Sequence, residues 1–341
     1  MSRYQPPLTL TPRMLALIAE ISEQIGQLSA TDSSRQTPQL RRGNRIRTIQ
    51  ASLAIENNTL SIEQVTAVLA GQRVLGLPKE IQEVRNAFAA YECMPDWKPG
   101  SRVDLLKAHE LLMRGLIDEC GHFRRAGVGI YRGERLVHMA PPPSRIAHLI
   151  DDLLAWLDTS DWHPLITSCV FHYEFEFIHP FADGNGRMGR IWQTLILSQW
   201  RPVLAYLPVE AVVREQQDEY YAALSAADQM AESTPFVEFM LNALNVALHE
   251  AINSESLIDP VTDPVTDPVE RLLRALDGRS LRISDLMAAM GLTHKATFRA
   301  NYLKPALISE MIEMTDPETP SSPAQKYRLT ESGKRLVSRW K

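Results

Sequence analysis

HPFADGNGRMGR, residues 179–190, is the stretch that decides how the rest of the chain is interpreted. Glycines on both sides of Asn185 allow the positive φ angles that turn successive backbone N–H groups toward one point. Beyond the turn, one helical face collects Trp192, Leu195, Ile196 and Gln199. A helix therefore starts at the turn, and its N-terminus adds free N–H donors and a positive dipole end. These features predict a pocket for a polyphosphate.

The side chains of this stretch are of the types that phosphoryl-type transfer from a nucleotide needs. Arg187 and Arg190 are three residues apart, so both guanidinium groups lie near one helix face and can form forked bonds to phosphate oxygens. Asp183 is a hard oxygen ligand suited to Mg²⁺ that bridges phosphates. His179 lies outside the turn and can take a proton from an incoming hydroxyl at neutral pH.

The segment resembles a known family. It matches, at every fixed position, the HPFxDGNGRxxR signature of the Fic family of protein AMP-transferases, and the preceding FHYEFEFI (residues 171–178) is similar to the family's approach helix. A Walker A loop is excluded, since the chain contains no GxxxxGK[ST]. The resemblance implies a mainly α fold, a helical Fic domain with a small β-hairpin flap, and transfer of AMP from ATP to Ser, Thr or Tyr hydroxyls of target proteins and of the chain itself.

The same resemblance implies a role for each residue of the motif. His179 is the catalytic base, and Asp183 holds Mg²⁺. The remaining positions are implied to bind ATP and its phosphates: Gly184, Asn185, Gly186, Arg187, Met188, Gly189 and Arg190. Phe181 is expected to anchor the loop in the core.

A second motif lies upstream. Ser52-Leu-Ala-Ile-Glu56-Asn57 matches the [S/T]xxxE[G/N] inhibitory motif of many Fic proteins, on a helix expected at about 40–57. The resemblance implies that Glu56 pairs with Arg190. Such a carboxylate would occupy the donors that the γ-phosphate needs and would repel that phosphate. Holding the competent state near one per cent needs only about 2.7 kcal/mol, which one partly buried, forked ion pair can largely supply.

Residues 121–143 differ in composition from the helical segments on either side of them. Glycines and alternating apolar residues predict a short hairpin about residues 132–134. Its position resembles the Fic flap, which covers the nucleotide and offers a strand edge to the target, and this implies target docking by Leu136, Val137 and His138. The alternative is a small structural hairpin, and the chain has no Val-x-Ile-Gly-Gly flap run.

Tyr220-Tyr221-Ala-Ala-Leu resembles the family's YYxAL segment, on the adenine side of the site. Tyr221 is therefore a candidate to stack on the base, with core packing as the alternative. Relatives commonly have asparagine where Asp228 stands.

Length, composition and net charge limit the classes of protein to which the chain can belong. The 341 residues are 45% apolar and 23% charged, with a net charge of −5, so nothing points to nucleic-acid or membrane binding by the whole chain. Three widely spaced cysteines without CxxC argue against a disulfide framework and a zinc site, and suit a reducing compartment. The start has no apolar core of signal-peptide length, and no run approaches a membrane span. We expect a cytoplasmic protein.

Helical periodicity and breakers predict the domain organisation. Helices are expected over 40–57, 61–69, 78–91, 103–120, 144–157, 164–177, 209–228 and 234–248. An N-terminal helical region (1–100) precedes the catalytic domain (101–250). The repeat DPVTDPVTDP ends a semi-rigid linker over 251–268.

Residues 269–341 form a last predicted domain with 13 Lys and Arg against 8 Asp and Glu. Helices at 270–276, 284–290 and 295–303, then strands at 308–314 and 326–330, resemble a winged helix-turn-helix. Basic residues that could touch phosphates are His294, Lys295, Arg299 and Lys304. The excess of +5 is modest, so interaction with protein is favoured over DNA.

Several alternatives remain open at this point. The scaffold could use another nucleotide or a phosphocholine donor, or remove AMP with Glu56 orienting a water. It could also act mainly as a regulator through the last domain. A homo-oligomer is compatible with the sequence.

Overall fold

The computed structural model describes residues 4–35, 38–132, 135–257, 267–276, 278–290, 298–309, 311–316, 322 and 325–339. The chain divides into two compact units, Met1–Glu255 and Ser256–Lys341. Each unit has its own hydrophobic core. The mainly helical fold predicted from the sequence is confirmed.

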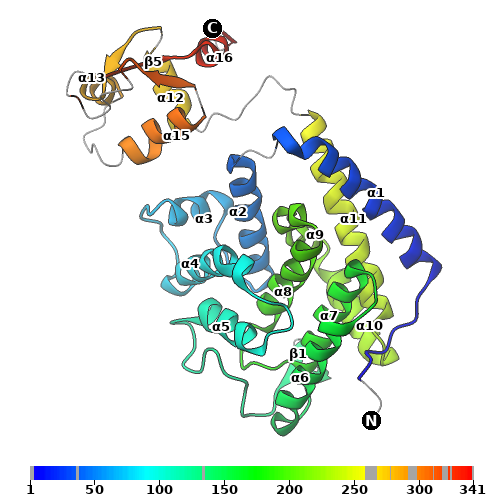
Figure 1. The fold of residues 1–341 in the computed structure, drawn as a ribbon. Coiled ribbons are helices and arrows are strands. Elements are labelled where there is room, and N and C mark those ends of the chain that lie inside the picture. The colour runs from blue at the N-terminus through cyan, green and yellow to red at the C-terminus, as the bar shows by residue number, and fades with distance from the viewer. Residues whose placement is uncertain are drawn as a thin grey trace. The chain divides into compact units, whose positions relative to one another are not determined.

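The first unit is built from helices packed around a central pair (Figure 1). Its helices are α1 (Pro12–Arg35), α2 (Pro38–Ile55), α3 (Ile62–Leu69), α4 (Pro78–Cys93), η1 (Met94–Asp96), α5 (Arg102–Met113), α6 (Pro143–Thr159), α7 (Pro164–Ile178), α8 (Asn185–Trp200), η2 (Pro202–Tyr206), α9 (Val209–Glu215), α10 (Gln217–Met230) and α11 (Thr234–Leu257).

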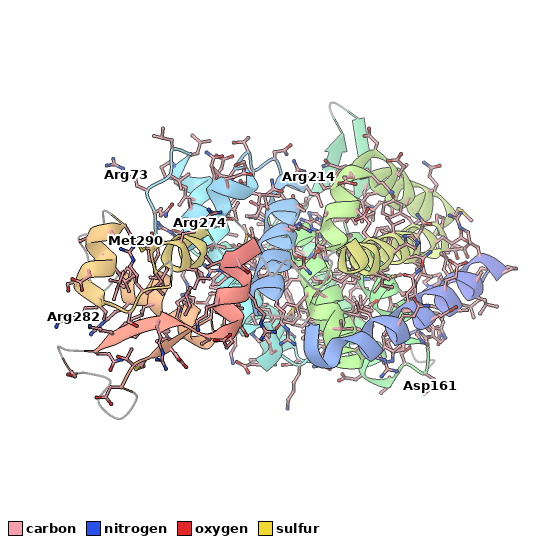
Figure 2. All side chains as sticks on the ribbon, turned by 90° about the horizontal axis from the view of Figure 1, so that it is seen from above. Arg73, Asp161, Arg214, Arg274, Arg282 and Met290 are labelled. Carbon is pink, nitrogen blue, oxygen red and sulfur yellow. The ribbon has the colours of Figure 1, made fainter. Side chains whose placement is uncertain are left out.

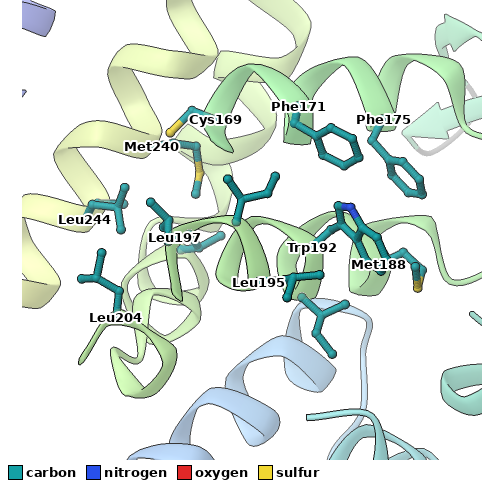
Figure 3. Packing of buried hydrophobic residues seen from close by; sticks show 14 of the residues in the cluster. Cys169, Phe171, Phe175, Met188, Trp192, Leu195, Leu197, Leu204, Met240 and Leu244 are labelled. Atoms are coloured by element: carbon teal, nitrogen blue, oxygen red, sulfur yellow. The ribbon is translucent and has the colours of Figure 1, made fainter. Parts of the chain in front are cut away.

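Helices α7 and α8 form the central pair. Helix α7 carries apolar residues on nearly all sides, as a helix enclosed by protein does, and most of its residues are buried. Figure 3 shows Phe171 and Phe175 of α7 above Met188, Trp192 and Leu195 of α8. All five are buried, so the loop that joins the two helices is held between two rigid elements.

Helix α2 brings the upstream motif to this pair. It packs against α8, α9 and α4. Across its contact with α9, Arg214, which is labelled in Figure 2, donates from Nη1 to Gln50 Oε1 at 2.7 Å. The next helix, predicted to start at residue 61, begins with a capping box in which Ser61 and Gln64 bond each other's backbone N–H. The contacts of α2 with α4, α8 and α9 therefore hold the end of α2 close to the core.

Helix α5 is shorter than predicted, since the prediction of helix over 103–120 is wrong beyond Met113. The carbonyls of Leu112 and Arg114 both accept from Asn86 Nδ2, at 3.1 and 2.8 Å. Gly115 then takes a φ of +73°. A buried side chain from α4 thus ends the helix by satisfying its last carbonyls.

The single helix predicted over 209–228 is also wrong, because α9 and α10 are separate helices. The break falls at Gln216, which leaves the helical region with φ −107° and ψ 38°. Gln217 Nε2 donates to the carbonyl of Ile55 at 3.1 Å, so the start of α10 meets the end of α2.

The predicted hairpin is present. Strand β1 (Gly129–Arg132) pairs antiparallel with β2 (Arg135–Met139), while residues 133 and 134 lie outside the described residues. Ile130 pairs with His138 but Tyr131 pairs with Leu136, so one extra residue, Val137, sits in β2. Such a bulge bends and twists the strand that carries it.

The second unit combines short helices with a three-stranded sheet of order β3-β5-β4. Its elements are α12 (Asp267–Leu276), β3 (Leu281–Arg282), α13 (Ile283–Ala289), η3 (Arg299–Leu303), α15 (Lys304–Ile308), β4 (Ile312–Met314), β5 (Lys326–Leu329) and α16 (Glu331–Arg339). Figure 2 labels Arg274 on α12 and Arg282 on β3.

The strand predicted over 308–314 is wrong at its start. Helix α15 runs to Ile308, and Met311 N–H returns to the carbonyl of Ala306 at 3.1 Å before the strand begins. Strand β3 and helix α16 were not predicted. Residues 258–266 of the predicted linker, together with His294 and Lys295, lie outside the described residues, whereas residues 251–257 belong to α11. Arg299 and Lys304 begin η3 and α15.

Among the described residues, no helix is long and apolar enough to cross a membrane. The described cysteines are free: Cys93 is exposed, Cys120 is half-buried and Cys169 is buried.

Trp192 tests the importance of the central pair. Its ring is fully buried, and its Nε1–H donates to the carbonyl of Pro99 at 3.0 Å. We expect Trp192→Ala to lower the free energy of unfolding of the first unit by about 3–5 kcal/mol in urea titrations, because it leaves a cavity and an unpaired carbonyl. Leu75→Ala is the control, since Leu75 is 92% exposed and should change stability by about 0.5 kcal/mol or less. Equal effects of the two substitutions would contradict this account.

Candidate active site

His179 lies at the point where α7 ends. Its backbone takes the left-handed conformation, with φ 48°, and closes the helix. Arg124 fixes this turn: its Nε donates to the carbonyl of His179 at 2.7 Å, and its guanidinium also bonds the carbonyls of Ala126 and Pro141. A buried guanidinium thus ties the histidine to the base of the hairpin. Arg124 was not identified from the sequence.

The ring of His179 is suited to accept a proton. Burial lowers the pKa of His179 below its ordinary value, so the ring is neutral at pH 7. Its Nδ1 lies 4.0 Å from Oε2 of Glu176, one turn earlier on α7. That carboxylate would stabilise the imidazolium that forms on proton uptake.

The loop after His179 is held by its own asparagine. Asn185 Oδ1 accepts from the N–H of Phe181, and Asn185 Nδ2 donates to the carbonyl of Phe181, both at 2.9 Å. The side chain of Asn185 therefore shapes the loop, and its predicted contact with phosphate falls to its backbone N–H. Phe181 is fully buried, as predicted.

His109 supports the loop from below. Its ring stacks on Phe181 with centroids 3.6 Å apart, and its Nδ1 accepts from the N–H of Gly121. Nε2 therefore carries the proton and donates to the carbonyl of Asp183 at 3.0 Å. Burial lowers the pKa of His109 to about 4, which keeps the ring neutral. His109 is fully buried.

Gly184 and Gly186 each have a physical reason to be glycine. Gly184 takes φ +83° as the residue before α8, and its N–H donates to Asp183 Oδ1 at 2.6 Å. A Cβ on Gly186 would collide with Glu56 Oε1 and lie 3.0 Å from Arg190 Nη1. No side chain caps the start of α8, so the N–H groups of its first turn are available to an anion.

Arg187 lies between two carboxylates. Its Nη1 is 3.3 Å from Glu83 Oε1, and its Nη2 is 3.4 Å from Asp183 Oδ1. Glu83 is buried, and its second oxygen accepts from Asn58 Nδ2 at 2.9 Å. Glu83 was not identified from the sequence, since nothing in its local pattern distinguishes it from a solvated residue of α4.

Arg190 is held by the upstream motif. Its Nε donates to Ser52 Oγ and its Nη2 to the carbonyl of Ser52, both at 3.0 Å, while Nη2 also bonds Glu56 Oε1 at 2.7 Å. Burial alone would lower the pKa of Arg190, but the charge and hydrogen bond of Glu56, together with the charges of Tyr220 and Glu176, outweigh burial and raise that pKa. Glu56 keeps 33% exposure of its side chain. Asn57 follows it with φ 67° and is exposed at the end of the helix.

Met188 and Gly189 pack inside the protein. Met188 is fully buried, and its N–H donates to the carbonyl of Gly184. A Cβ on Gly189 would lie 2.6 Å from His172 Cδ2 and 3.1 Å from Glu176 Oε1. Gly189 thus makes room for the side chains that surround the base, and the binding role predicted for these two residues stays a prediction.

Tyr221 lies on α10, half-buried, with its ring at the edge of Tyr220. Its role toward adenine stays a prediction. Asp228 on the same helix accepts from Tyr173 Oη at 2.9 Å and faces His138 at 3.0 Å.

The three residues predicted to dock a target lie on β2. Leu136 pairs with Tyr131, Val137 is the extra residue of the bulge, and His138 pairs with Ile130. The ring of His138 contacts Asp228 and the carbonyl of Phe177, so it bonds the body of the unit.

Asp183 is the candidate metal ligand. Its carboxylate is 47% exposed beside the first turn of α8. The described residues contain no group of three or more His, Cys, Asp or Glu side chains that could hold a metal by themselves. A single carboxylate fits Mg²⁺ that takes its other ligands from nucleotide phosphates and water.

Comparisons with known proteins agree with this geometry. Residues 99–197 match the family model described as Fic/DOC family, and residues 267–330 match "Filamentation induced by cAMP protein Fic-like, C-terminal domain". A crystal structure of a Fic family protein from Desulfovibrio desulfuricans G20 is 61% identical, covers 96% of this chain and 99% of that one, and superposes with a TM-score of 0.74.

More distant relatives are animal proteins. The protein adenylyltransferases Fic of Drosophila erecta and Drosophila melanogaster are 30% identical over 213 residues, which are 59% of this chain and 40% of theirs. The chain thus spans about two fifths of the length of these curated relatives. Fic-1 of C. elegans (residues 134–508) shares the fold, at 22% identity over 72% of this chain and 73% of that one, with a TM-score of 0.57.

Gly184 tests the geometry of the loop. We expect Gly184→Ala to destabilise the first unit by about 2–4 kcal/mol, because it combines the cost of a positive φ with a Cβ 2.6 Å from Sδ of the buried Met113. Gly71→Ala is the matched control: Gly71 has φ +73° but nothing within 4 Å of its Cβ, so it should cost only about 1 kcal/mol. Urea unfolding of both variants measures the difference, and the absence of a difference would contradict the close approach of Met113.

Proposed function

The chain belongs to the Fic family, and we propose that it is a protein adenylyltransferase, which transfers AMP from ATP to Ser, Thr or Tyr hydroxyls of target proteins and of itself. One observation carries the proposal. A neutral histidine, an uncapped helix N-terminus and two buried arginines meet on one loop. The names of the Drosophila relatives support the same chemistry.

ATP would lie along the 183–190 loop. The first-turn N–H groups of α8 would donate to phosphate oxygens, and Arg187 and Arg190 would neutralise the outer charges. Asp183 would hold Mg²⁺, which supplies positive charge against the phosphates when bound. On ATP binding, Arg187 would exchange its contact with Asp183 for one with phosphate.

His179 would act as general base. A target hydroxyl forms a bond from its oxygen to the α-phosphorus, and its proton passes to His179. The bond from the α-phosphorus to the oxygen that bridges to the β-phosphate breaks, and pyrophosphate leaves. Glu176 would stabilise the resulting imidazolium, and the fixed donors of the loop would stabilise the charge that develops on phosphate oxygens.

Glu56 would restrain this activity. Its bond to Arg190 occupies a donor that the γ-phosphate needs, and its charge repels that phosphate. The two bonds from Arg190 to Ser52 keep the guanidinium turned toward α2, so ATP would compete with three acceptors. Because Glu56 is one-third exposed, its side chain could leave the pocket without unfolding α2.

Removal of this carboxylate tests the restraint. We expect Glu56→Gly to raise self-labelling by α-³²P-ATP about 10- to 100-fold, since a restraint of about 2.7 kcal/mol corresponds to a factor of 100. Glu63→Gly is the control, because Glu63 is an exposed acid on α3 that accepts a hydrogen bond from the hydroxyl of Ser61. Unchanged labelling by the Glu56 variant would count against autoinhibition.

Loss of the base tests the chemistry. We expect His179→Ala, in the Glu56→Gly background, to abolish labelling, because the proposed base that takes the hydroxyl proton is removed. Parallel incubation with labelled ATP, UTP, GTP and CTP identifies the donor. If the chain were labelled only by UTP, GTP or CTP and not by ATP, the adenylyl assignment would be overturned. The catalytic role of His179 would still stand.

A further inference from the structure

The ring of His138 joins the hairpin to the body of the first unit. Its Nδ1 lies 3.0 Å from Asp228 Oδ2 on α10, and its Nε2 lies 2.8 Å from the carbonyl oxygen of Phe177 on α7. The ring also packs against the Phe177 side chain, with centroids 4.8 Å apart. One residue of β2 therefore contacts two helices that are distant from it in the sequence.

This arrangement requires a proton on both ring nitrogens. A carboxylate and a carbonyl oxygen are acceptors only, so a neutral ring could satisfy one of them and would leave a lone pair facing the other. The second oxygen of Asp228 already accepts from Tyr173 Oη at 2.9 Å, which fixes the carboxylate in place. The imidazolium is the form that completes both contacts.

The charges around the ring favour that form. The titratable groups that act on it are the Asp228 and Glu176 carboxylates and the imidazole of His179. The His138 side chain is only 10% exposed, and burial by itself disfavours the charge. The bonds to Asp228 and to the Phe177 carbonyl, with the two carboxylate charges, outweigh burial and raise the pKa of His138.

We propose that His138 is a positioning residue whose imidazolium clasps β2 to α10 and α7, so that the hairpin is held in place when this ring is charged and loosens when it is neutral. This differs from the direct contact with target that the sequence suggested. The part of the inference that concerns target presentation rests on the proposed function, whereas the clasp itself does not.

The clasp and the base then respond to pH in opposite senses. Because the folded-state pKa of His138 is raised, the clasp is fully present below the ordinary histidine pKa and is lost as pH rises through the raised value. The pKa of His179 is lowered, so the base becomes available at a lower pH. Labelling should therefore rise on the acid side with deprotonation of His179 and fall on the alkaline side with deprotonation of His138.

Hydrogen exchange of the full chain tests the clasp without any need for activity. In His138→Gln and in Asp228→Asn, protection factors of the amides that bridge β1 and β2 should fall about 10-fold or more, as expected for loss of a hydrogen bond between charged groups. The double variant should fall no further than either single one. His148→Gln is the matched control, since His148 faces Asp152 at 3.4 Å on α6 but is 74% exposed and does not bond the hairpin.

Unchanged protection in both single variants, or additive losses in the double variant, would overturn the clasp. A ¹⁵N spectrum of the imidazoles provides the second measurement: both nitrogens of His138 should be protonated at pH 6, below the ordinary histidine pKa. A neutral His138 at that pH would also overturn it.

Labelling by α-³²P-ATP in the Glu56→Gly background tests the link to activity. His138→Gln should remove the alkaline fall and leave the acid limb in place, and persistence of the alkaline fall would overturn the link. A chain that labels with no nucleotide would contradict the proposed function, and the exchange experiment would still decide on the clasp.

Discussion

The structure depends on how the backbone of the α7–α8 loop is satisfied. This loop is buried on one side and must leave N–H donors free on the other. Side chains from outside the loop bond its carbonyls: Arg124 reaches His179, and His109 reaches Asp183. Asn185 closes the loop on itself. Because these bonds use neutral or fully paired groups, the two arginines and the helix N-terminus keep their positive charge for a ligand.

Each signature arginine has a carboxylate partner. Two buried guanidinium groups without counter-charges would carry a large desolvation cost, and the two acids supply those counter-charges. Glu83 is buried and tied to Asn58, which makes it a permanent partner of Arg187. Glu56 is partly exposed and bonds through one oxygen, which makes it the exchangeable partner of Arg190. The same charge balance that stabilises the buried arginines would also provide the restraint proposed for Glu56.

The sequence by itself predicted what lies in continuous segments. The 179–190 motif, the helix that starts at residue 61 and the glycine-rich hairpin each follow from local backbone rules and residue spacing. The position of Glu56 near Arg190 was inferred from two motifs that lie far apart in the chain, with the family resemblance as the link.

Tertiary structure alone decided the contacts between distant segments. His138 contacts Asp228, and Arg187 is paired with Glu83. Helix α5 ends early because Asn86 on α4 donates to the carbonyls at its C-terminus. The local sequence around each of these polar residues is the same as that around a solvated residue. The spacing of residues along a helix shows which of them share a face, but it does not show which polar side chain of another helix will contact that face. Local backbone geometry depends on neighbouring residues and can be predicted from them. The pairing of buried charges depends on how distant segments pack in the core, so it requires the tertiary structure.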